Sequence, residues 1–114
     1  MNFINFEVGN NTYKLRLNTR GIVLLEKQVG CNPLNIFGAN YDTVPTITVM
    51  VAILHASLQQ YNHGITLNDA YDLFDKWLED GHATTDFLQV IMEIYQASGI
   101  VPKDTNEELQ VKND

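Results

Sequence analysis

The chain has 114 residues, with 14 acidic and 7 basic side chains, which gives a formal charge of −7 at neutral pH. The length fits one domain, and a hydrophobic fraction of 45% is typical of a globular protein rather than a disordered one. The acidic balance argues against nucleic acid as the main partner, because phosphate binding needs clustered basic residues. The single cysteine, Cys31, excludes an intramolecular disulfide.

The first residues show neither a basic segment nor an apolar segment of the kind found in secretory signals. The longest membrane-like run, residues 47–54, is far shorter than the ~20 residues that a transmembrane helix needs. We therefore expect a soluble protein of a reducing compartment, without a membrane partner.

Residues 3–17 show the period-two alternation of a β-hairpin, with Asn10 and Asn11 as the expected turn. This turn would also set Glu7 opposite Lys14. It pairs the apolar residues as follows: Ile4 with Leu17, Phe6 with Leu15, and Val8 with Tyr13. A hairpin of this size is marginal alone, so its apolar face must pack on helices.

Helical periodicity follows from residue 18 onward. Helices are expected over about 19–29, 33–37, 45–61, 67–80 and 84–98. The helix over 45–61 has the widest apolar arc and is predicted to be the central one. Thr66 and Asp69 have the spacing of a capping box at the start of the next helix. The predicted fold is mainly α with a small N-terminal β-hairpin (α+β), a compact bundle of about four to five helices over residues 1–102. Residues 103–114 are predicted to form a polar mobile tail.

The three histidines, His55, His63 and His82, lack the spacing of metal ligands. His55 is expected at a helix interface, and we predict no metal and no cofactor. No Gly-x-Ser-x-Gly motif and no glycine-rich phosphate loop occurs, and Cys31 follows a helix C-terminus, where the dipole disfavours a thiolate. We therefore predict that the protein is not an enzyme.

Four acidic residues recur every three or four positions on the helix predicted over 67–80: Asp69, Asp72, Asp75 and Glu79. A solvated stripe lacks the pocket that paired catalytic acids require. It is either a plain soluble face or an electrostatic docking face. Together with Glu93 of the last helix, these residues are the candidate interaction surface. A free edge of the hairpin is a second way to bind protein, by strand addition.

Several segments in this order resemble a known family. They are YKLRLNTR at 13–20 leading into LEK at 25–27, NPLNIF at 32–37, LHASLQQYNHG at 54–64 and AYDLFD at 70–75. Over residues 3–100 the chain resembles the small tail assembly chaperones of long-tailed (siphovirus-type) bacteriophages and prophages. The resemblance supplies no motif of binding residues.

The resemblance implies a non-catalytic chaperone in the cytoplasm of the bacterial host that is not retained in the mature virion. Such proteins bind the tape measure protein, keep it soluble and help to recruit tail tube subunits. The resemblance also implies a homo-oligomer and, in many relatives, a longer form made by ribosomal frameshifting.

Two other interpretations remain open from the sequence. A head–tail completion or connector protein would be a permanent component of the particle. A small helical regulator would use residues 67–80 and 84–98 as a helix-turn-helix, but the second segment carries Asp86 and Glu93 and no Lys or Arg.

Overall fold

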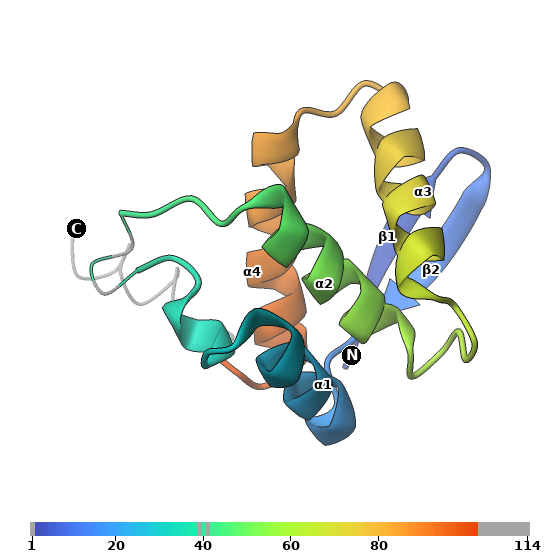
Figure 1. Ribbon diagram of the computed structural model, residues 1–114. Helices are drawn as coiled ribbons and strands as arrows, with labels where there is room; N and C mark the ends of the chain where they lie inside the picture. The colour runs from blue at the N-terminus through green and yellow to red at the C-terminus, as the bar shows by residue number, and fades with distance from the viewer. Residues whose placement is uncertain (1, 39, 41, 103–114) are drawn as a thin grey trace, which may run out of the picture.

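The computed structural model describes residues 2–38, 40 and 42–102. The predicted α+β class is confirmed: an N-terminal hairpin precedes four α-helices in the described part of the chain (Figure 1). The strands and helices are β1 (Ile4–Val8), β2 (Asn11–Leu15), α1 (Thr19–Val29), α2 (Ile47–Leu58), α3 (Leu67–Glu79) and α4 (Phe87–Ala97). Two short 3-10 helices, η1 (Pro33–Asn35) and η2 (Thr84–Asp86), precede α2 and α4.

The predicted central helix is α2, although it is shorter than expected (Figure 1). Eight of its 12 residues are buried, and it contacts α1, α3, α4 and β2. It begins only after Thr46, whose hydroxyl accepts a hydrogen bond from the Val49 N–H. From Met50 onward α2 is largely covered by these neighbours and needs no polar face, which explains its mostly apolar composition.

Helix α1 approaches α2 closely at Gly21. A Cβ atom at this position would lie 3.2 Å from the backbone oxygen of Ala56. Glycine lowers helix propensity, but at this position the missing side chain lets the two helices pack closely. The side chain of Asn18 caps the same turn by accepting a hydrogen bond from the Gly21 N–H.

The hairpin forms with a register two positions away from the predicted one. The strands pair Ile4 with Leu15, Asn5 with Lys14, Phe6 with Tyr13, Glu7 with Thr12 and Val8 with Asn11. The predicted pairs, including Glu7 with Lys14, are therefore wrong. The turn begins at Gly9, whose φ of 60° lies in the left-handed region that glycine adopts without steric cost. A slip of two residues keeps every side chain on its face, so Phe6, Val8 and Leu15 are buried as expected.

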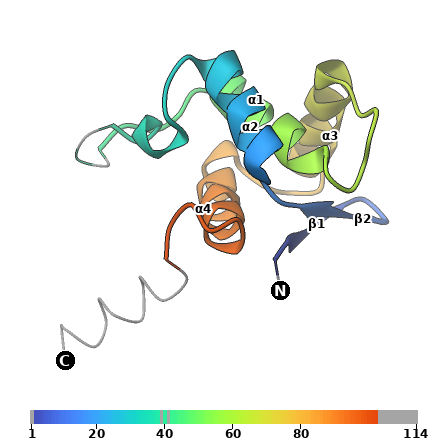
Figure 2. The ribbon, with the colours of Figure 1, turned by 90° about the horizontal axis from the view of Figure 1, so that it is seen from below.

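An aromatic cluster joins the hairpin to the helices. The ring of Phe6 lies 5.6 Å from that of Trp77 on α3 and 6.0 Å from that of Phe87 on α4. Phe74 packs on both Trp77 and Phe87. Seen from below, the hairpin lies below α3 and beside α4, and β1 contacts both helices (Figure 2). No third strand pairs with the hairpin among the described residues, so each strand keeps one edge without a strand partner.

The segment around η1 projects to one side of the bundle in both views (Figures 1 and 2). The phenol of Tyr95 on α4 anchors it by donating a hydrogen bond of 2.9 Å to the backbone oxygen of Pro33. Burial, with a smaller contribution from Cys31, raises the pKa of Tyr95, so the phenol stays a donor. Leu34 is exposed, because within the single turn of η1 only Pro33 is buried.

Helix α3 begins with the predicted capping box of Thr66 and Asp69. Two apolar residues of α3, Leu67 and Tyr71, are more than one third exposed. The buried face of the helix is therefore narrower than the spacing of its apolar residues predicts. The predicted mobile tail, residues 103–114, lies outside the described residues. Among the described residues, no helix combines the length and apolarity needed to cross a membrane.

Candidate interaction surface

The acidic residues in and around α3 divide into those that the fold uses and those that it does not. Asp69 belongs to the first group: its Oδ2 accepts a hydrogen bond of 2.9 Å from the Thr66 N–H, and its own N–H donates to the Thr66 hydroxyl. The backbone bond and then the hydroxyl of Thr66 hold the pKa of Asp69 below its ordinary value. Its carboxylate therefore has a structural role at the helix N-terminus.

Asp80, just beyond α3, is a structural acid that sequence reasoning missed. Its Oδ2 accepts a hydrogen bond of 2.6 Å from the Gly9 N–H, which ties the hairpin turn to the end of α3. An acid at a helix C-terminus opposes the helix dipole, and this unfavourable position was the available signal of a tertiary partner. Asp86 is also structural, because its Oδ2 accepts a hydrogen bond from the Ala83 N–H at the start of η2.

Three acidic residues on α3 have no such structural role. Asp72, Asp75 and Glu79 are exposed, and their carboxylates form no ion pair or hydrogen bond within the described part of the chain. They lie three, four and seven residues apart, so they share one side of the helix, and we call them the α3 acidic face. Like charges at this spacing cost about 0.2–0.5 kcal/mol per pair, so the fold gains nothing from them.

Glu93 does not extend this face. It lies on α4, where its Oε2 accepts a hydrogen bond of 3.3 Å from the Gln89 side chain one turn earlier. The structure therefore keeps Asp72, Asp75 and Glu79 together as candidate residues, and it places Glu93 on a different helix.

A hollow lies beside the α3 acidic face, between β2 and α3. It encloses about 330 Å³ and is lined by Tyr13, Ile65, Asp69, Asp72, Leu73 and Lys76. Tyr13, Ile65 and Leu73 are half-buried and form its apolar part, whereas the charged residues are exposed. We call it the β2–α3 hollow. It combines apolar side chains with the free carboxylate of Asp72.

The side chain of the nearby Lys14 contacts two aromatic rings outside the hollow. Its ammonium lies 4.9 Å from the ring centroid of Phe3 and 5.7 Å from that of Tyr61, in cation–π contacts. Because side chains alternate along a strand, Lys14 points to the face opposite Tyr13. The basic side chain that lines the β2–α3 hollow is Lys76.

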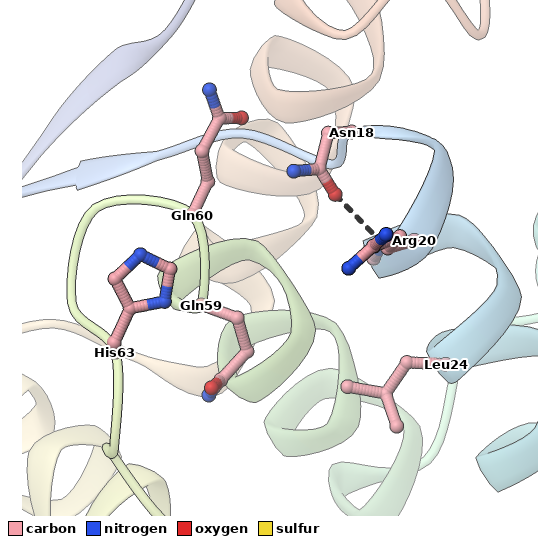
Figure 3. A pocket seen from close by; sticks show the side chains of 7 residues that line it. Asn18, Arg20, Leu24, Gln59, Gln60 and His63 are labelled. Atoms are coloured by element: carbon pink, nitrogen blue, oxygen red, sulfur yellow. Dashed lines mark hydrogen bonds between the residues drawn. The ribbon is translucent and has the colours of Figure 1, made fainter.

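A second depression, between α1 and α2, has a different character (Figure 3). It encloses about 220 Å³ and is lined by polar and basic residues around Leu24: Asn18, Arg20, Gly21, Gln59, Gln60 and His63. Gln59 is committed to the fold, because its amide donates to the backbone oxygens of His55 and Ile65. None of the described residues that line this α1–α2 groove is acidic. Arg20 gives it a positive charge, opposite to that of the α3 acidic face.

The histidines lie apart, each with its own neighbours. His55 is half-buried on α2, and its Nδ1 lies 3.4 Å from the Gln28 amide of α1, at the expected helix interface. Burial lowers its pKa, and a hydrogen bond with the Ile65 backbone partly opposes this. His82 stacks on Trp77 at 4.3 Å. Within the described residues, no group of three or more potential ligands is placed to hold a metal ion.

Comparison with protein families gives a match over most of the chain. A family of unknown function (DUF6096) matches residues 4–113. The chain belongs to this family. No curated protein and no solved structure shows a significant match to it. Membership covers the hairpin, all the helices described above and the α3 acidic face, and it brings no activity or partner with it.

Proposed function

We propose that this protein is a tail assembly chaperone of a long-tailed phage or prophage. In this role it binds the tape measure protein, keeps it soluble and helps to bring tail tube subunits to it. It acts without catalysis in the cytoplasm of the bacterial host and does not remain in the mature particle. The resemblance over residues 3–100 carries the identity of the partners.

The observation that best supports a protein-binding role is the α3 acidic face. Asp72, Asp75 and Glu79 repel one another, and none of them caps a helix or forms an ion pair within the described residues. Acids that the fold does not use supply solubility and electrostatic attraction to a basic partner. Both properties suit a protein that must coat a long helical client without aggregating.

We also propose that the chaperone self-associates. Among the described residues, each strand of the hairpin keeps one edge without a strand partner, so the β1 edge of one copy can meet the β2 edge of the next. A contact between two different surfaces is heterologous, so it adds copies head to tail. Such an assembly would present many binding faces along an elongated client.

Co-expression with the tape measure protein encoded beside this chain tests the proposal. We expect the tape measure protein to become soluble and to co-purify with many copies of this chain. The control is co-expression with an unrelated acidic protein of similar size, which should leave the tape measure protein insoluble. An insoluble tape measure protein in the presence of this chain would contradict the proposal. So would finding the chain in purified particles at the copy number of a ring.

A further inference from the structure

We propose that the β2–α3 hollow binds a Lys or Arg side chain presented by an amphipathic helix of the partner, beside an apolar residue of that helix. This inference deepens the proposed function by naming the chemistry that the site recognises. It is carried by the hollow's apolar part, its free carboxylate and the charge of the surrounding helix.

The apolar part fits the stem of a long basic side chain. Tyr13 from β2, Ile65 from the loop after α2 and Leu73 from α3 converge on the hollow, and each remains half-buried rather than covered. Lys and Arg side chains pack their methylene stems along apolar surface while the charged end seeks a polar partner. A volume of about 330 Å³ leaves room for that stem and a neighbouring apolar side chain.

The charged end of such a side chain meets Asp72. This carboxylate lines the hollow and has no partner within the described part of the chain, whereas Asp69 beside it is already bonded to the Thr66 N–H. The ordinary alternative, a lysine of this chain neutralising Asp72, is not realised. Lys76 lies one turn further along α3 and forms no ion pair with Asp72.

Lys76 determines at which end of the hollow a basic side chain is favoured. Its ammonium repels a second cation, so an entering basic side chain is favoured at the end of the hollow near Asp72. The proposal therefore predicts opposite effects for two neighbouring substitutions. Neutralising Asp72 weakens binding, and neutralising Lys76 strengthens it. General stickiness of an apolar patch would produce neither effect.

An amphipathic helix is the partner form that matches this geometry. From Asp72, the α3 acidic face continues along the helix for about two turns, through Asp75 and Glu79. A helix of basic and apolar residues lying along α3 can place one basic side chain in the hollow and others near these carboxylates. The contact in the hollow then fixes the position of the partner helix, and Asp75 and Glu79 attract its other basic side chains at longer range.

The test uses the full chain and two synthetic helical peptides of 18 residues or so, a length of about five helical turns. One peptide has Leu on one side of the helix and Lys on the other side. The second peptide carries Glu in place of each Lys. Binding is measured by calorimetry, and the site is located by amide chemical shifts. We expect the Leu/Lys peptide to bind and to shift Tyr13, Ile65 and Leu73, and the Leu/Glu peptide not to bind.

Matched variants locate the effect. Asp72→Asn should weaken the Leu/Lys peptide about five- to tenfold, as expected for loss of one close charge partner. Asp75→Asn removes the same charge from the same helix outside the hollow and should change the affinity by less than about twofold, in line with a solvent-exposed charge. Lys76→Gln should tighten binding. Equal losses from Asp72→Asn and Asp75→Asn would overturn the proposal, because binding would then be diffuse.

Other outcomes also contradict it. Absence of Leu/Lys binding, or binding of the Leu/Glu peptide, would remove the chemistry proposed for the hollow. Shifts at Tyr13 and Leu73 that grow with protein concentration alone would assign the hollow to a second copy of the chain. Because the peptides contain no phage sequence, these results are separate from the tape measure experiment. The hollow can fail while the chaperone role stands, and the reverse also holds.

Discussion

At the scale of single residues, the acidic side chains are the most informative feature of this protein. Their number in the sequence indicates only a soluble surface, and their spacing does not separate structural from free carboxylates. The structure separates them by their hydrogen bonds. Asp69 and Asp80 accept from backbone N–H groups, whereas Asp72, Asp75 and Glu79 accept none from any described residue. Asp69 was predictable because a capping box is local. Asp80 was not, since its partner Gly9 lies 71 residues away.

The bond between Asp80 and Gly9 leads to a stability prediction. Asp80→Ala should lower the free energy of unfolding by about 1 kcal/mol, because it removes an acceptor that fixes the hairpin turn and leaves only water as the replacement. Urea denaturation of both proteins measures the difference. Asp75→Ala is the matched control on the same helix. It should leave stability unchanged or raise it by a few tenths of a kcal/mol, through better helix propensity and less repulsion. Equal losses in the two variants would show that the Gly9 bond contributes nothing.

At the scale of elements, periodicity located most of the fold and failed where pairing depends on turn chemistry. The helices α1, α3 and α4 follow from apolar spacing and from caps such as Thr66. The strands follow from alternation, which fixes the buried face but not the partner of each residue. The predicted register rested on asparagines in the turn, whereas the chain turns at Gly9, where a positive φ costs least. The boundaries of α2 also differ, because an evenly apolar segment carries no periodic signal of where a helix begins.

The packing of the hairpin on α3 and α4 is testable through Phe6. This side chain is buried against Trp77 and Phe87. Phe6→Ala should lower the free energy of unfolding by about 3–5 kcal/mol, the range for deleting a buried aromatic ring. The exposed Glu7 on the same strand provides the control, since Glu7→Ala should stay within about 0.5 kcal/mol of the parent. Thermal and urea unfolding give both values. A loss below about 1 kcal/mol for Phe6→Ala would mean that the hairpin does not pack as described.

At the scale of the whole molecule, the fold and its candidate surface come from different kinds of information. Many apolar residues with helical or strand spacing form the core, so the fold class was predictable from the sequence. The interaction surface was predicted as a stripe of four acids together with Glu93 of the last helix. The structure places Asp69 in the predicted capping box and Glu93 on α4, apart from the α3 acidic face. The β2–α3 hollow was not predictable, because it joins Tyr13 to residues more than 50 positions away. Only the three-dimensional arrangement of β2 and α3 creates it.

The most direct test of the proposed function is to neutralise the α3 acidic face and to ask whether the chain still keeps the tape measure protein soluble. The variant Asp72→Asn, Asp75→Asn, Glu79→Gln should fold at least as stably as the parent, because it relieves repulsion between like charges. A matched variant, Glu7→Gln, Glu26→Gln, Glu93→Gln, removes the same charge from exposed acids elsewhere.

In co-expression, we predict that the α3 variant leaves the tape measure protein insoluble, while the matched variant keeps it soluble like the parent. Equal retention of solubility by both variants would contradict the assignment of function to the α3 acidic face. Equal loss of solubility with both variants would show that the total charge of the chain, and not the α3 acidic face, keeps the tape measure protein soluble.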